Sequence, residues 1–195
     1  MFDRKSVRLK GFDYSTPGAY FVTICTYQKQ CLFGVVENGE MKLCKEGKLI
    51  DKWWKEMPIR FPQVKLDEYI IMPDHMHGVL WIGNGVGATR CGRPRTRNRP
   101  VEQDMFCSYG FRRKTKGDHA GSPVRPSMTL GKMIGWFKTM TSNEYINRVK
   151  ECGWEPFGGK VWQRNYYEHI IRNDIDLMRI RKYIQDNPTK WEMDY

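Results

Sequence analysis

Residues 66–83, LDEYIIMPDHMHGVLWIG, hold two of the chain's four histidines and decide the fold. Apolar runs on either side of Pro73-Asp74 are rich in strand-forming residues, which is typical of two strands joined by a turn. Because successive side chains of a strand point to opposite faces, His75 and His77 are expected on one face of a sheet. The stretch therefore predicts either two imidazoles that converge on one metal ion or two ordinary polar side chains at a strand end.

The size and composition of the chain favour a single globular domain over residues 1–195. The chain is long enough to bury one core, and its 40% hydrophobic and 13% aromatic content argues against global disorder. It contains no apolar run near the roughly 20 residues that span a bilayer, and its first residues lack the apolar segment of a signal peptide. The six cysteines form no CxxC pair, which argues against a zinc ribbon. We expect a soluble, cytoplasmic protein with no membrane partner.

The net charge of +11 indicates a polyanionic partner, and nucleic acid is the commonest one. A basic surface that only maintains solubility is the alternative. The charge is concentrated at about residues 84–126, where ten Lys or Arg stand against three Asp or Glu, a local net of +7. This segment is also rich in Gly, Pro and Thr, so we expect a flexible insertion. It is either an electrostatic sleeve for nucleic acid or a solvated loop.

The other expected elements are a strand, a hairpin around Asn38-Gly39, two helices, a further strand and a last helix. Apart from the hairpin, they are expected in chain order at residues 20–27, 45–57, 128–150, 161–171 and 175–187. Ser127 is the expected N-cap of the long helix, Asn173 or Asp174 that of the last helix, and Pro188 its stop. This order predicts an α+β fold of ferredoxin-like type, an antiparallel sheet with helices packed on one face.

Tyr183 and Asn187 stand four residues apart on the expected last helix and therefore share a face. If that helix lies beside the histidine strand, Asn187 can give a metal held by His75 and His77 an oxygen ligand. Such a ligand set suits Mg²⁺ or Mn²⁺, although histidines alone also accept Zn²⁺. Tyr183, one turn away, is then a candidate nucleophile, because a phosphotyrosine conserves the phosphodiester for rejoining. An ordinary half-buried helix residue is the alternative for Tyr183.

Three blocks of the sequence together carry a family resemblance. They are RLKGFDYSTPGAYFVTICT at residues 8–26, MPDHMHGVLW at 72–81 and VWQRNYYEHIIRNDIDLMRIRKYIQDNP at 161–188. With them, the chain resembles the tyrosine transposases associated with repetitive extragenic palindromes (REP), relatives of the IS200-type single-strand transposases. The resemblance covers nearly all of the chain except the basic insertion.

The resemblance implies a ferredoxin-like fold with an HUH metal site, in which U is a hydrophobic residue, here Met76. It implies that His75 and His77 are metal ligands, that Tyr183 in KYIQDNP is the nucleophile, and that Asn187 stands where relatives place a third polar ligand, often Gln. It further implies cleavage of single-stranded DNA near a hairpin through a 5′-phosphotyrosine intermediate. The palindrome-associated group is generally monomeric, so we expect a monomer, with a dimer as the alternative.

Basic residues interleaved with aromatic ones are what binding of unpaired nucleotides requires. The candidate DNA contacts are Arg8, Lys10, Lys138 and Arg164. Glu168 and His169 are expected to be polar scaffold residues.

Two other functions stay open at this stage: a non-catalytic DNA hairpin-binding protein derived from a transposase, and a metal-dependent phosphoesterase that uses water. The second is disfavoured, because phosphoesterases with paired HxT/S motifs need two such motifs and this chain has one HxH.

Overall fold

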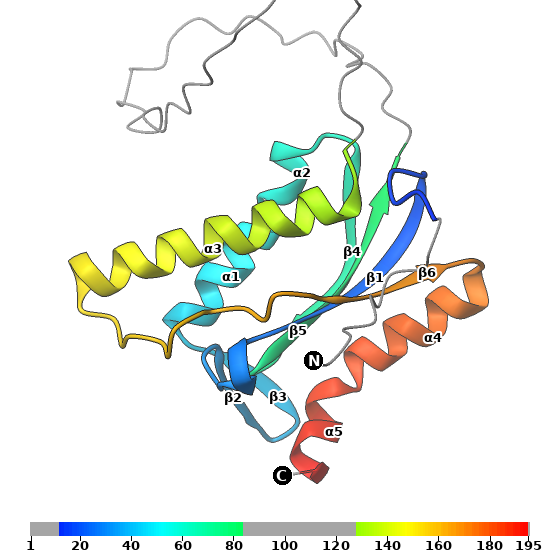
Figure 1. Cartoon of the computed structure of the whole chain (residues 1–195). Coiled ribbons are helices and arrows are strands. Elements are labelled where there is room, and N and C mark those ends of the chain that lie inside the picture. The colour runs from blue at the N-terminus through cyan, green and yellow to red at the C-terminus, as the bar shows by residue number, and fades with distance from the viewer. Residues whose placement is uncertain (1–11, 84–127, 195) are drawn as a thin grey trace, which may run out of the picture. The chain divides into compact units, whose positions relative to one another are not determined.

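The computed structural model describes residues 12–83 and 128–194 (Figure 1). Arg8, Lys10 and the basic insertion expected at about 84–126 lie outside the described residues. In the described part of the chain, no helix is both long and apolar enough to cross a bilayer. The four cysteines in that part are free thiols.

The main sheet has four strands in the order β4-β5-β1-β6, and each strand is antiparallel to its neighbours. The strands are β1 (Gly18–Cys25), β4 (Val64–Ile71), β5 (His75–Ile82) and β6 (Tyr167–Ile171). A separate hairpin pairs β2 (Gly34–Glu37) with β3 (Glu40–Leu43). Its turn residues Asn38 and Gly39 both have positive φ, as the Asn-Gly signal predicts.

The helices complete a β-α-β-β-α-β order around the sheet, so the predicted ferredoxin-like α+β class is confirmed. In chain order they are the 3₁₀ helix η1 (Tyr27–Lys29), α1 (Lys45–Lys55), α2 (Met57–Arg60), α3 (Leu130–Cys152), α4 (Asp174–Gln185) and α5 (Asn187–Asp194).

The helices cover both faces of the sheet, which corrects the expectation of one covered face. The first face packs against α1 and α3 through a large aromatic core that includes Trp54 and Phe137. The second face carries α4, which buries Leu177 and Ile184 against Val79 of β5. The physical reason is the strand alternation, because β5 buries even-numbered residues on the first face and leaves Val79 on the other.

Gly78, the residue directly after the two histidines, allows the first face to close. A Cβ at position 78 would lie 2.5 Å from Cζ2 of Trp54. Since Trp54 is fully buried on α1, any side chain at position 78 would displace it. The glycine is therefore required by the core on the opposite side of the strand from the histidines.

Three boundaries differ from the sequence expectation. The N-cap of α3 is Thr129, whose side chain accepts a hydrogen bond from the backbone N–H of Lys132, and not Ser127. The strand expected at 161–171 is regular only in β6, and Trp162 forms an isolated bridge with Thr26. The last helix is two helices, because α4 ends at Gln185 and α5 begins at Asn187.

Candidate metal and nucleophile site

His75 and His77 occupy the first and third positions of β5 and project from one face, as the alternation predicts. Their Nε2 atoms lie 3.1 Å apart, and the ring centroids are separated by 4.6 Å at an interplanar angle of 71°. Two adjacent ligands of one ion with bonds of about 2.1 Å at right angles lie about 3.0 Å apart. The two Nε2 atoms are therefore spaced as ligands of a shared cation.

Each histidine has a partner for its other ring nitrogen. Nδ1 of His75 lies 2.5 Å from Oδ1 of Asp74, and Nδ1 of His77 lies 2.8 Å from Oγ1 of Thr23. When Nδ1–H donates to these oxygens, each Nε2 keeps its lone pair. This second layer of hydrogen bonds is the usual way in which a protein orients metal-binding imidazoles.

His77 is buried, with 4% of its surface exposed. Burial, followed by the neighbouring His75, lowers the pKa of His77 to about 3, although Asp74 acts in the opposite direction. His77 is therefore neutral at neutral pH, which is the form that binds a metal ion.

Tyr183 on α4 reaches the same place from the helix side. Its hydroxyl lies 3.3 Å from Nε2 of His77, and the two ring centroids are 5.1 Å apart. Phe21 of β1 stacks on His77 at 5.4 Å and meets Tyr183 edge-on at 6.1 Å. Tyr183 is 41% exposed, so its side chain is partly accessible from solvent while its hydroxyl lies against His77.

The position of α4 is fixed by an ion pair between Arg181 and Asp67 of β4. Nε and Nη2 of Arg181 donate to the two carboxylate oxygens at 2.8 and 2.6 Å. Nε1 of Trp81 donates to Oδ2 of the same carboxylate at 2.9 Å. These bonds, with Arg181 as the main cause, hold the pKa of Asp67 well below its usual range. We call this arrangement the Asp67–Arg181 clasp.

A register shift between Leu66 and Tyr69 changes the alternation of β4 around the clasp. Leu66 and Tyr69 both pack against the core of the first face, although they differ by three residues. Such a bulge re-aims the side chains beside it, here at Asp67.

Asn187 does not share the helix of Tyr183, which corrects the argument from four-residue spacing. Asp186 ends α4, and Pro188 stands in the first turn of α5, where a missing N–H costs nothing. Asn187 is buried, with 8% of its surface exposed. Its role as a third ligand stays a prediction.

The C-terminal helix brings two other side chains to the site. The ring centroid of Trp191 lies 5.8 Å from that of His75, and Nζ of Lys190 lies 5.3 Å from the ring centroid of Tyr183. Lys190 therefore places a positive charge next to the tyrosine. Across residues 12–83 and 128–194, His, Cys, Asp and Glu form no group of three that could hold a metal ion. A metal at this site would have the two histidine nitrogens as ligands, and a further protein ligand would be of another type, such as the amide of Asn187.

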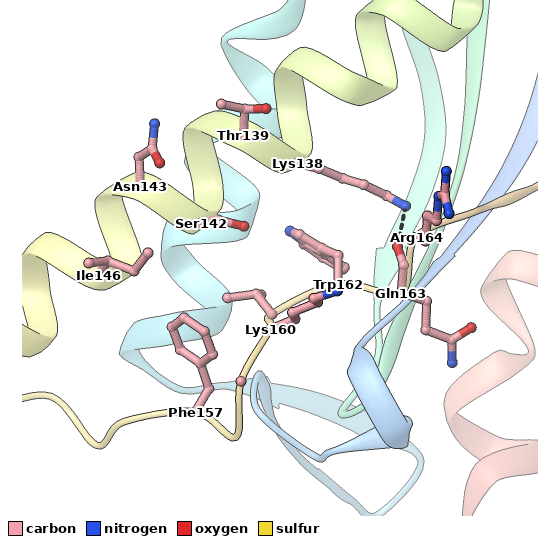
Figure 2. Close-up of a pocket in the computed structure, with 12 residues that line it drawn as sticks. Lys138, Thr139, Ser142, Asn143, Ile146, Phe157, Lys160, Trp162, Gln163 and Arg164 are labelled. Atoms are coloured by element: carbon pink, nitrogen blue, oxygen red, sulfur yellow. Dashed lines mark hydrogen bonds between the residues drawn. The ribbon is translucent and has the colours of Figure 1, made fainter.

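The remaining predicted site residues lie elsewhere. Lys138 and Arg164 line one pocket beside α3 (Figure 2). Nζ of Lys138 donates to the backbone oxygens of Gln163 and Asn165 at 2.9 and 2.8 Å, so its ammonium group holds this segment in place. Nε2 of His169 lies 2.8 Å from Oδ2 of Asp176, a contact that suits the scaffold role expected for it.

Several residues of the site were missed from the sequence. Asp74 had a signal, because a carboxylate directly before a candidate ligand is a natural hydrogen-bond partner for it. Thr23 had no signal until the strand register was known, since it pairs with His77 across 54 residues. The contact between Asp67 and Arg181 could not be predicted from local patterns either, because the two residues are 114 positions apart.

An α+β fold that pairs two strand histidines with a helix tyrosine can be compared with known proteins. The family model "Transposase IS200 like" matches residues 118–187, which include Tyr183 and Asn187. The structure of a REP-associated tyrosine transposase bound to a REP hairpin matches with a TM-score of 0.53 at 15% identity, covering 96% of this chain and 74% of that one. This likeness shows the shared fold.

An uncharacterized protein of Haemophilus influenzae (strain ATCC 51907 / DSM 11121 / KW20 / Rd) is 38% identical over 191 residues, 98% of this chain and 91% of that protein. The match to the IS200-like family model, together with the shared fold, supports a transposase-type protein of the IS200-like family.

Proposed function

We propose that the protein is a metal-dependent endonuclease and strand transferase that cuts single-stranded DNA beside a hairpin through a 5′-phosphotyrosine at Tyr183. The observation that carries the proposal is that three polar atoms converge. Nε2 of His77 lies 3.1 Å from Nε2 of His75 and 3.3 Å from the Tyr183 hydroxyl. The hairpin substrate is proposed from the REP hairpin bound to the structural relative.

His75 and His77 would hold the metal ion, Mg²⁺ or Mn²⁺, with Asn187 as the proposed third ligand. When bound, such an ion polarises a phosphate oxygen and offsets the negative charge that develops during displacement. The residues fit this role, because the two Nε2 atoms face each other and each Nδ1 has an oxygen partner.

In the proposed cleavage step, the Tyr183 hydroxyl attacks the scissile phosphorus. A phosphorus–oxygen bond to tyrosine forms, the bond to the 3′-oxygen breaks, and the leaving 3′-oxygen takes up a proton as the tyrosine gives one up. The phosphodiester count is unchanged, so a second 3′-hydroxyl can reverse the step and join a different strand. Lys190 contributes positive charge beside the tyrosine, where the phosphate would lie.

Both halves of the site come from one chain, which supports the proposal that a monomer is competent. β5 supplies the histidines and α4 the tyrosine, and the Asp67–Arg181 clasp joins α4 to the sheet of the same chain.

The test is to incubate the protein with labelled single-stranded hairpins and Mn²⁺ or Mg²⁺ and to look for a protein band that gains the mass of an oligonucleotide. Chelator, His75→Ala and His77→Ala should each remove that band, whereas hairpin affinity should stay within a few-fold, because most backbone contacts are untouched. Lys150→Ala, at an exposed position of α3, is the control and should retain the band. Equal cleavage by wild type and both histidine variants in chelator would contradict the metal site.

A further inference from the structure

A pocket of about 420 Å³ lies between α3 and the segment that leads into β6 (Figure 2). Its size falls in the range of about 300–1,000 Å³ that small-molecule sites occupy. Figure 2 shows side chains from the helix and from the segment around one space. The lining residues include Ser142, Asn143, Ile146, Phe157, Lys160 and Arg164.

The charge of the pocket is positive. Among the residues that the structure describes, its lining includes Lys138, Lys160 and Arg164 but no aspartate or glutamate. The ammonium group of Lys138 already donates to two backbone oxygens, whereas the side chains of Lys160 and Arg164 are exposed. The pocket therefore favours an anionic group, such as a phosphodiester.

The other lining groups suit a nucleobase. Ile146 is 37% exposed and Phe157 is partly exposed, so the pocket offers apolar surface against which a base can pack. Asn143 and Ser142 add an amide and a hydroxyl within the same lining. Phosphate-binding cations beside an apolar surface with a few polar groups are what one nucleotide requires.

The wall that carries these groups is held rigidly. Nε1 of Trp162 donates to Oγ1 of Thr141 at 2.8 Å, and both residues are buried. The ammonium of Lys138 bonds the backbone on either side of Arg164. A site built on a fixed wall loses less entropy when a ligand binds.

The same wall is bonded to the end of β1 that lies beside His75. The backbone N–H of Gln163 donates to the oxygen of Cys25 at 2.9 Å, and Cys25 pairs with His75 in the β1–β5 register. The pocket wall is therefore joined to β1, the strand that lies between this segment and the histidine strand β5.

We propose that this pocket binds one unpaired nucleotide of the DNA strand that extends from the hairpin, with its phosphate on Lys160 and Arg164 and its base against Phe157 and Ile146. The proposal rests on the proposed function for the identity of the ligand as single-stranded DNA. It adds a contact that lies apart from the histidines and the tyrosine.

The test measures affinity in chelator, so that it does not depend on cleavage. The probes are one labelled hairpin without an extension and two with an unpaired extension of about six nucleotides on the 5′ or the 3′ side. Lys160→Ala and Arg164→Ala should weaken binding of one extended hairpin by about fivefold or more and binding of the plain hairpin by less than about twofold. Ser142→Trp, which fills the pocket without changing its charge, should act in the same way.

Lys150→Ala is the matched control, because Lys150 is an exposed lysine of α3 outside the pocket lining. It should weaken all probes alike and only slightly. The proposal is overturned if the pocket variants, with unchanged melting temperatures, weaken all three probes equally or none at all. If Ser142→Trp lowers the melting temperature, Asn143→Ala replaces it. A protein that binds extended hairpins through the pocket but forms no phosphotyrosine would refute the proposed function and leave this inference standing.

Discussion

The two faces of the main sheet differ in what holds them together. The face toward α1 and α3 packs a continuous aromatic core, in which Trp54 meets Phe137 at 5.4 Å and Tyr69 at 6.1 Å. The face toward α4 buries only a small apolar cluster around Val79, Leu177 and Ile184. The sheet is therefore stabilised mainly from one side, and the candidate site occupies the weaker side.

Because of this difference, the position of α4 on the sheet depends on polar contacts. A helix with two buried apolar residues gains little from packing, so its register also depends on polar contacts. These are the Asp67–Arg181 clasp, the contact of Asp176 with His169 of β6, and the contacts at the tyrosine. Sites that must admit a substrate are commonly built on the less stable part of a fold. The predictions below separate the contributions of the two faces.

Truncation of the core face should have the largest effect on stability. Trp54→Ala should lower the free energy of unfolding by about 3–5 kcal/mol, because it empties a fully buried site. Ile184→Ala on the α4 face should cost about 2 kcal/mol, since its cluster is small. Urea denaturation measures both values. Equal losses would show that the two faces contribute alike.

Acid should weaken the α4 face through His77. Its pKa is lowered from 6.5 to about 3, mainly by burial. In the unfolded chain this histidine is protonated below about pH 6.5, whereas in the folded protein it is protonated only below about pH 3. The free energy of unfolding should therefore fall as the pH falls through this window, by about 1.4 kcal/mol per unit at most, and should not depend on His77 above it.

Urea denaturation of the metal-free protein across pH 3–7 tests this dependence. His77→Gln should remove most of the slope, whereas His169→Gln, at an exposed position, should leave it in place. A slope that survives in His77→Gln belongs to other groups.

Loss of the clasp should affect activity more than stability. Arg181 is 41% exposed on its side chain, so Arg181→Ala should cost only about 1 kcal/mol of stability. The rate of phosphotyrosine formation should fall about tenfold, because a small displacement of a reacting group raises the activation barrier. Hairpin affinity should stay unchanged. Arg179→Ala, an exposed arginine on the same helix, is the control.

The double variant Asp67→Arg with Arg181→Asp should recover part of that rate, because it restores an ion pair between α4 and β4. Hydrogen exchange of the α4 amides gives a second readout that needs no catalysis, and it should quicken in Arg181→Ala alone. Identical rates for Arg181→Ala and Arg179→Ala would mean that the clasp does not place the tyrosine.

Local patterns predicted the features that depend on neighbouring residues. The alternation of HMH placed two imidazoles on one face, and Asn38-Gly39 marked its turn correctly. Features that depend on tertiary pairing were not predictable. The spacing of Tyr183 and Asn187 implied one helix, but the chain breaks at Asp186 and starts a second helix with Pro188 in its first turn.

The covered face of the sheet was missed for a related reason. Periodicity shows that the last helix has an apolar side but not which face of the sheet receives it. Which face receives the helix depends on the strand register, and the same register brings Thr23 next to His77.

The central claim is that the Tyr183 hydroxyl, held 3.3 Å from Nε2 of His77, is the nucleophile. Tyr183→Phe keeps the ring and its packing against Phe21 and His77 and removes only the oxygen. The most direct measurement is a denaturing gel of wild type and Tyr183→Phe after incubation with a labelled single-stranded hairpin and Mn²⁺. We predict a covalent protein–DNA band for wild type and none for Tyr183→Phe, with hairpin binding intact in both. A band that persists in Tyr183→Phe would contradict the claim and point to another tyrosine.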